Sequence, residues 1–396
     1  MHPDLDALLA LHFDQATGRR RVLDAETIVH CHHYNARLQR TIESASAVDG
    51  KAIVVSTAEG VFAELLGRAF RSIDGAGDRR ALATALYSTL GYGALADESL
   101  AEPTVVATHS HFVEGWGAGF PERRSPVCSF TEGYLQAALS LVEGTPVGVR
   151  EVECMAAGAK VCRFAVTRDR TSPLATFPRV APCACPPSLA GGMRSPTVDE
   201  EAIVAAVAKM PLVGNAQGLV PAFNVYLASV PADFYNLVSL RFVEEMAQKG
   251  LGRPAQAQLQ HDAETCGINT FGGVISSPEW DALVGPMLRE EQDALFGVVA
   301  VSNALGWGRW QIVSHEPAES LTLATANGYE ASGQLAYRGR SAAPSCWMLT
   351  GVAAGLMALI YGAGSVRERF GQFHALEAGC RGTGAVACRH EVEVPE

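Results

Sequence analysis

The chain has 396 residues, which is long enough for two domains of ordinary size, each with its own core. Hydrophobic residues make up 48% and charged residues 18%, and no run of 18 uncharged apolar residues occurs, so we expect a globular protein without a membrane span. The formal net charge of −11, with no basic stripe, argues against nucleic acid as a partner. The N-terminal segment carries acids where a signal peptide needs basic residues, so we expect a cytoplasmic location.

The first part of the chain predicts helices, then a strand, a helix and a hairpin. Residues 19–44 begin as an extended segment and become helical near Tyr34, and two more helices are expected at 58–73 and 81–93. The β-branched segment 103–116 predicts a strand, 128–141 a helix, and 145–166 a hairpin with its turn at Gly158. Residues 168–198 are rich in Pro, Ala and Ser and lack periodicity, so they are expected to be a linker.

The second part of the chain predicts the same plan. Helices are expected at 230–246, 276–288 and 293–308, a strand pair at 320–330, a helix at 346–362 and a hairpin at 375–394. Tyr34-Asn35 is matched with Tyr235-Asn236, and TLGYGAL (89–95) with ALGWGRW (304–310). We therefore predict an α+β fold of two similar domains, 1–167 and 199–396, each combining helices with an antiparallel sheet and a closing hairpin, packed as a pseudo-dimer.

Two sets of cysteine and glutamate residues carry the repeat. In each set a cysteine opens a helix, a glutamate follows on the hairpin, and two cysteines come three and eleven residues after that glutamate. Three thiolates and one carboxylate form a plausible tetrahedral zinc set, and a closed shell of four ligands favours a structural role over a catalytic one. The eight predicted ligands are Cys128, Glu151, Cys154 and Cys162, and then Cys346, Glu377, Cys380 and Cys388.

The Cys and Glu-x-x-Cys-x7-Cys pattern, together with the Gly-x-Gly turns at 91–93 and 306–308, resembles the 4-vinyl-reductase-type domain. That domain occurs in a bacteriochlorophyll-biosynthesis accessory protein and in the ligand-binding domains of phenol sensors. The resemblance implies one zinc ion per set, two per chain, and a pocket for a small hydrophobic or aromatic ligand, including tetrapyrrole-like ones. The chain lacks the G-x-x-x-x-G-K-[ST] motif of an ATPase module, so it is not expected to be a phenol-type transcription activator.

Five histidines distinguish the first half from the second. His30, His32 and His33 lie near a helix start, and His109 and His111 alternate on the expected strand, whereas the matched positions Pro231, Asp233 and Phe234 carry no histidine. Imidazole suits iron, zinc and copper, so one interpretation is a second metal or haem site. The alternative is that these are ordinary surface and core histidines.

Aromatic residues give the candidate ligand pocket. Tyr34, Trp116 and Tyr134 are the residues we expect at its wall, although core packing accounts equally for each of them. Two functions remain: binding of a small hydrophobic or aromatic ligand by a zinc-stabilised protein, or a metalloenzyme that uses the histidine cluster. The sequence leaves open whether the protein is an enzyme, and it leaves open a homodimer.

Overall fold

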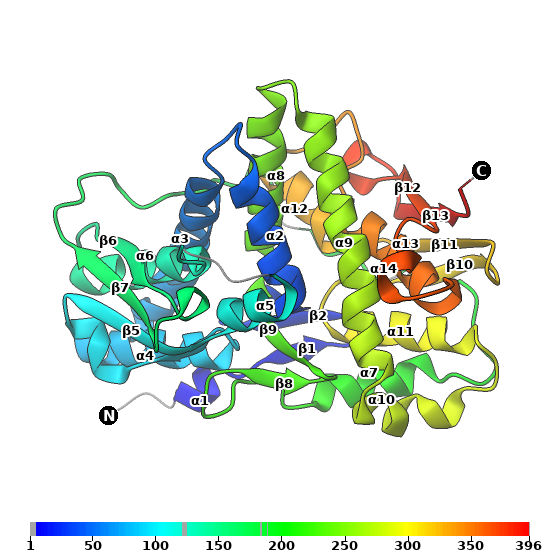
Figure 1. The fold of residues 1–396 in the computed structure, drawn as a ribbon, viewed down its shortest axis with the longest axis horizontal. Coiled ribbons are helices and arrows are strands. Elements are labelled where there is room, and N and C mark those ends of the chain that lie inside the picture. The colour runs from blue at the N-terminus through cyan, green and yellow to red at the C-terminus, as the bar shows by residue number, and fades with distance from the viewer. Residues whose placement is uncertain (1–4, 121–124, 183, 188, 396) are drawn as a thin grey trace.

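The computed structural model describes residues 5–120, 125–182, 184–187 and 189–395 (Figure 1). The elements of the first half are α1 (Leu5–Leu8), β1 (His12–Asp14), β2 (Arg19–Val22), β3 (Ala25–Cys31), α2 (His32–Ser44), α3 (Gly50–Ala69), η1 (Phe70–Ser72), α4 (Ala76–Thr89), β4 (Gly93–Leu95), η2 (Asp97–Ala101), β5 (Thr104–Ser110), α5 (His111–Gly119), α6 (Ser129–Glu143), β6 (Gly148–Glu153), η3 (Met155–Ala157) and β7 (Cys162–Thr167).

The second half follows the same sequence of elements with longer helices. They are α7 (Glu200–Lys209), β8 (Val220–Ala222), β9 (Val225–Pro231), α8 (Ala232–Ala247), α9 (Gly252–Ile275), α10 (Pro278–Leu283), η4 (Gly285–Met287), α11 (Asp293–Ala304), β10 (Gln311–Glu316), β11 (Ser320–Thr325), α12 (Tyr329–Tyr337), α13 (Trp347–Tyr361), α14 (Val366–Arg369), β12 (His374–Gly379), η5 (Arg381–Thr383) and β13 (Cys388–Glu393).

Two four-stranded antiparallel sheets share one strand order. The first runs β4-β5-β7-β6 and the second β10-β11-β13-β12, and they lie at opposite ends of the molecule (Figure 1). In each sheet the last two strands form the predicted hairpin. The helix–strand–hairpin plan confirms the α+β class expected from the sequence.

A third sheet joins the two halves in the middle of the molecule. Its order is β1-β2-β3-β9-β8, and β3 pairs with β9 in antiparallel fashion, with Val29 opposite Ser229. The bounds of β3 and β9, and the first residues of α2 and α8, differ by 200 in each case. The expected match of Tyr34 with Tyr235 is therefore wrong by one residue, because Asn35 holds the position that Tyr235 holds in the other half.

The long helices pack across the halves. α2 contacts α9 of the second half, and α8 contacts α3 of the first, while α3 and α9 also pack on α6 and α13 of their own halves. Glycines allow these last two close approaches. A Cβ on Gly133 would lie 2.3 Å from the Val55 carbonyl oxygen of α3, and one on Gly351 would lie 2.1 Å from the Gln260 carbonyl oxygen of α9. This equivalence places α9 residues 205 positions after their α3 counterparts.

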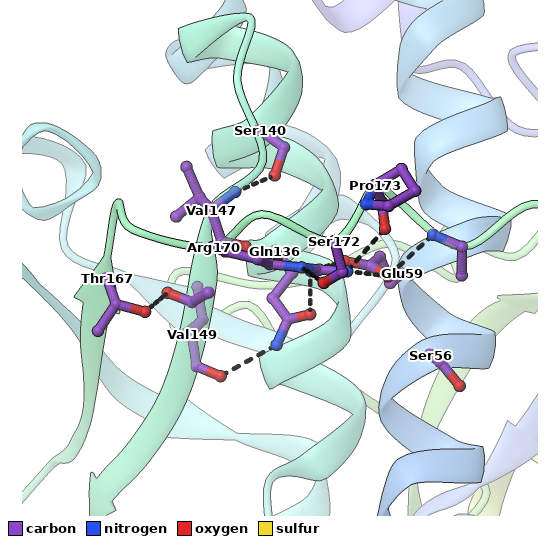
Figure 2. A network of polar contacts seen from close by, with 12 residues as sticks. Ser56, Glu59, Gln136, Ser140, Val147, Val149, Thr167, Arg170, Ser172 and Pro173 are labelled. Atoms are coloured by element: carbon purple, nitrogen blue, oxygen red, sulfur yellow. Dashed lines mark hydrogen bonds and ion pairs between the residues drawn. The ribbon is translucent and has the colours of Figure 1, made fainter.

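The segment 168–198 contains no helix or strand among its described residues, and it is fastened to the first half by Arg170. The Arg170 guanidinium forms an ion pair with the buried Glu59 of α3 and donates to Gln136 Oε1 of α6 at 2.9 Å (Figure 2). The Ala175 amide donates to the same glutamate at 3.0 Å. The start of the segment is therefore held against α3 rather than hanging free.

Most predicted helices and both hairpins are confirmed, but two helices were missed. α9 and α12 bury small and polar side chains, among them Asp262, Gly267 and Thr270, so their sequences lack a clear apolar stripe. Among the described residues, no helix combines the length and the apolar composition that crossing a lipid bilayer requires.

Candidate functional site

The first candidate metal centre lies between the start of α6 and the β6–β7 hairpin. Cys128 is the residue before α6, Glu151 lies on β6, Cys154 follows β6, and Cys162 opens β7. The Cys128 and Cys162 sulfurs are 3.8 Å apart, and the Cys162 and Cys154 sulfurs are 3.9 Å apart. All four ligand atoms lie within 4.8 Å of one another and all four residues are buried. The predicted set is thus assembled.

The second candidate centre repeats this geometry at the start of α13 and on the β12–β13 hairpin. The Cys346 sulfur lies 3.6 Å from that of Cys388 and 4.0 Å from that of Cys380, and Glu377 completes the set. Each hairpin carries a β-bulge directly after its glutamate, between Glu151 and Glu153 and between Glu377 and Gly379. The bulge turns the chain so that the glutamate and the cysteine three residues later face the same point.

The distances between the sulfur atoms fit a tetrahedral metal ion. With metal–sulfur bonds of about 2.3 Å, tetrahedral geometry requires sulfurs about 3.8 Å apart. The observed separations of 3.6 to 4.0 Å match this value. They are much longer than the roughly 2.05 Å of a disulfide bond, which these cysteines do not form.

The two glutamates supply a second, independent indication of a cation. Oε2 of Glu151 accepts a hydrogen bond from the Cys128 amide at 2.7 Å, and Oε2 of Glu377 accepts one from the Cys346 amide at 2.8 Å. In both residues Oε1 is buried without a hydrogen-bond partner among the described residues. Burial raises the pKa of each carboxyl to about 8. A metal ion in the centre would satisfy Oε1 and offset this cost, so the residues present fit one.

The comparison with protein families agrees with this geometry. The model of the 4-vinyl-reductase-type domain matches residues 117–168, which span the end of α5, α6 and the β6–β7 hairpin with its four candidate ligands. The chain contains a 4-vinyl-reductase-type domain. This confirms the family expected from the sequence, and the second candidate centre lies outside the matched residues.

Among solved structures, the chain is similar to the phenol-responsive sensory domain of the transcription activator PoxR, determined with phenol. The identity is 15%, the match covers 50% of this chain and 90% of that chain, and the TM-score is 0.37. The comparison with curated proteins gives no match.

The five histidines of the first half do not form a third ligand set. Among the described residues, only the two Cys/Glu sets bring three or more His, Cys, Asp or Glu ligand atoms within 4.8 Å of one another. His109 and His111 do not share a strand face, since β5 ends at Ser110 and His111 begins α5. His109 is partly exposed and contacts its neighbour Thr108, whereas His111 is buried.

The buried histidines are parts of the core between the halves. The His30 ring lies 4.5 to 4.8 Å from the rings of Tyr34, Trp307 and Tyr235. Burial lowers the pKa of His30 and of His111 to about 3, so both are neutral at pH 7. Neither ring nitrogen of His30 has a hydrogen-bond partner among the described residues.

A polar chain links the two halves beside these histidines. The Tyr235 hydroxyl donates to Asn35 Oδ1 at 2.6 Å, and Asn35 Nδ2 lies 2.9 Å from His111 Nε2. Since the amide nitrogen is a donor, His111 Nε2 is the acceptor and its proton sits on Nδ1, which has no partner among the described residues. Asn35 and Tyr235 hold equivalent positions in the two halves, so this contact lies on the pseudo-symmetry axis.

An apolar cavity lies on the inner face of α2. Leu38 and Ile42 of α2 line it together with Phe112 and Phe130, and the second half contributes Phe234. Two further α2 residues, Asn35 and Gln39, add its polar groups. The cavity is enclosed and narrow, with room for about one water molecule, so a larger occupant requires the surrounding phenylalanines to rotate.

Gln39 is the polar residue of this cavity that sequence reasoning missed. Its Nε2 donates to the Val127 carbonyl oxygen at 2.6 Å, whereas its Oε1 is buried without a partner among the described residues. The signal was present, because Gln39 follows Asn35 by four residues and thus interrupts the buried face of a helix. The expected pocket residues Tyr34, Trp116 and Tyr134 are buried but do not line this cavity.

Proposed function

We propose that this protein binds a small aromatic ligand with a single hydrogen-bond donor in the apolar cavity of the first half. The observation that carries the proposal is Gln39 Oε1, a buried acceptor without a partner among the described residues, at the wall of an otherwise apolar cavity. An unsatisfied buried acceptor is costly, and a hydroxyl group on the ligand would satisfy it. The 4-vinyl-reductase-type domain around the neighbouring metal centre supports the same function.

The cavity also favours a ligand of modest size with a flat ring. Phe112 and Phe130 lie with ring centroids 4.9 Å apart, and Phe130 is 4.9 Å from Phe234. An aromatic ring that enters among them makes offset or edge-to-face contacts at similar spacing. Because Phe234 belongs to the second half, a ligand bound here would contact both halves at once.

In this proposal the two Cys/Glu centres bind zinc and act structurally. Three thiolates and a carboxylate in tetrahedral array leave no open position for a substrate, and zinc is the metal that this donor set suits best. Each centre fastens the start of a helix, α6 or α13, to the hairpin of its own half. Elemental analysis of freshly purified protein should give about two zinc per chain, and iron or copper in their place would contradict this assignment.

Calorimetric titration with phenol and toluene tests the ligand proposal. The two probes share a shape, but only phenol carries a donor, so phenol should bind roughly tenfold more tightly to the wild type. In Gln39→Met that preference should disappear. Gln136→Met is the matched control, since Gln136 also donates to a carbonyl oxygen, that of Val149, but its Oε1 is already paired with Arg170.

Two results would overturn the proposal. One is the absence of binding of either probe to the zinc-loaded wild type. The other is a preference for phenol that survives unchanged in Gln39→Met.

A further inference from the structure

A second cavity lies on the outer face of α2, between that helix and α9. Its volume is about 430 Å³, within the usual range for small-molecule sites. Apolar groups line its body, including Phe242 and Met246 of α8 and Ala255 of α9. Arg37 and Arg40 of α2 and Asp262 of α9 supply its charged groups. It shares no lining residue with the apolar cavity described above.

The other half of the molecule shows what occupies the equivalent place. There α8 packs on α3, and Arg241 extends its guanidinium between the two helices. Arg241 Nη1 donates to the Ile53 carbonyl oxygen at 3.2 Å, to Ser56 Oγ at 2.9 Å and to Thr57 Oγ1 at 2.7 Å. The ring of Phe177 lies 5.2 Å from its guanidinium carbon. This interhelical groove is thus filled by the chain itself.

In the α2–α9 groove both partners of that contact are changed. The position of Arg241 is taken by Thr41, 200 residues earlier, and that of Thr57 by Asp262, 205 residues later. Threonine is too short to fill the space of an arginine side chain, which explains why a cavity remains. The residue that faces the missing guanidinium is now a carboxylate, the acceptor that suits a guanidinium best.

Asp262 is only 1% exposed and is incompletely paired. Its Oδ1 lies 3.4 Å from Gln258 Nε2, and its Oδ2 has no hydrogen-bond partner among the described residues. Burial raises its pKa to about 6, while the Thr41 hydroxyl and the charges of Arg37 and Arg40 act in the opposite direction, so the group is ionised at pH 7. A buried carboxylate with a free oxygen at a cavity wall favours a cationic ligand.

The two arginines define the other end of the ligand. The guanidinium carbons of Arg37 and Arg40 lie 5.6 and 4.4 Å from the centre of the Phe120 ring, which also lines the cavity. Their positive charge disfavours a ligand that is a cation alone and favours one that also carries an anionic group. We propose that this cavity binds a small guanidinium compound that also carries a carboxylate, with the guanidinium on Asp262 and the carboxylate on Arg37 and Arg40.

Calorimetric titration of the full chain with L-arginine tests this site. L-arginine should bind, L-citrulline, which replaces the guanidinium with a neutral urea, should bind at least roughly tenfold more weakly, and agmatine, which lacks the carboxylate, should also bind more weakly. Asp262→Asn and Arg40→Met should each lower the affinity for L-arginine roughly tenfold or more. Arg71→Met, a change at an exposed arginine of the η1 turn, is the matched control and should leave it unchanged.

Thr41→Arg gives the decisive variant, because it restores the arginine that the other half has. Its side chain should occupy the cavity, pair with Asp262, raise the melting temperature and abolish L-arginine binding. The variant also keeps the test available if Asp262→Asn does not fold. The proposal is wrong if L-arginine does not bind the wild type at millimolar concentration, or if it binds Thr41→Arg as tightly as the wild type.

Discussion

The two halves of this protein agree at their outer ends and differ where they meet. At the outer ends, both Cys/Glu centres have the same ligand order, the same β-bulge and sulfur separations between 3.6 and 4.0 Å. In the middle, α2 presents His32, His33 and Asn35 where α8 presents Ala232, Asp233 and Tyr235. The groove beside α2 is open and the one beside α8 is filled by Arg241.

This difference separates two kinds of constraint. A tetrahedral centre tolerates little change, because losing one ligand removes the metal and the cross-link between helix and hairpin. The contact between the halves has no such requirement, so one copy can open a cavity while its counterpart stays packed. Ligand binding is therefore expected at the inner faces, and the predictions below test how equal the ends are and how unequal the middle is.

The largest effect is expected from breaking the centres one at a time. Cys162→Ala and Cys388→Ala occupy equivalent positions, so each should lower the metal content from two ions per chain to one. Each should also lower the melting temperature by roughly 10 °C, since a structural metal contributes several kcal/mol. Elemental analysis and calorimetric melting measure both quantities. A variant that loses both ions, or a melting temperature that moves in only one variant, would show that the centres are not equivalent.

The helix contacts behind the centres should be nearly as sensitive. Gly133→Ala and Gly351→Ala each place a methyl group within 2.3 Å of a backbone oxygen of the facing helix, so each should cost about 3 kcal/mol in unfolding free energy. Gly67→Ala is the control, because a Cβ there meets no atom within 4 Å in an α3 position, and it should stabilise by about 0.5 to 1 kcal/mol. Chemical denaturation gives the three values. A neutral Gly133→Ala would show that α3 and α6 pack less closely than described.

Acid should act on the middle of the molecule, through His30. Burial lowers its pKa to about 3, so the unfolded chain binds a proton below about pH 6.5 that the folded chain does not, and stability is lost as the pH falls. Between pH 7 and 5 this amounts to about 2 kcal/mol for one histidine. His30→Phe keeps an aromatic ring among Tyr34, Tyr235 and Trp307 and should lose less stability over that interval.

The control for this experiment is His374→Phe, at an exposed position of β12. It should follow the wild-type dependence of unfolding free energy on pH between 7 and 5. If His30→Phe follows that curve as well, the acid sensitivity lies elsewhere.

The sequence predicted the outer ends well and the middle poorly, for physical reasons. Ligand spacing such as Glu-x-x-Cys-x7-Cys is local, since one hairpin carries it, and so Cys154 and Cys162 could be placed from the sequence. The open groove depends on which residue of one half faces which residue of the other. Thr41 and Asp262 are 221 positions apart, and only the pairing of β3 with β9 brings their helices together. Their significance appears only beside Arg241 and Thr57.

The histidines illustrate the same limit. His109 and His111 were expected on one strand face, but the strand ends between them, at Ser110, whose side chain accepts a hydrogen bond from the Val113 amide and begins α5. A serine before an apolar run is a helix-start signal, and here it outweighed the β-branched residues that precede it. The alternation that suggested a metal site was therefore cut at its last member.

The smallest effect is expected at the surface of the two hairpins, where equivalent residues have acquired different partners. Arg163 pairs with Glu153 across β6 and β7 at 3.0 Å, whereas its equivalent, Arg389, pairs with Glu391 on its own strand at 2.9 Å. All four side chains are more than a third exposed, so Arg163→Ala and Arg389→Ala should each change the unfolding free energy by less than about 0.5 kcal/mol. Both arginines directly follow a metal ligand, which makes the pair a sharp probe of the centres in denaturant titrations. A loss of more than about 1 kcal/mol in either variant would mean that the charges around a centre contribute to holding its hairpin, and that the stable unit extends beyond the four ligands.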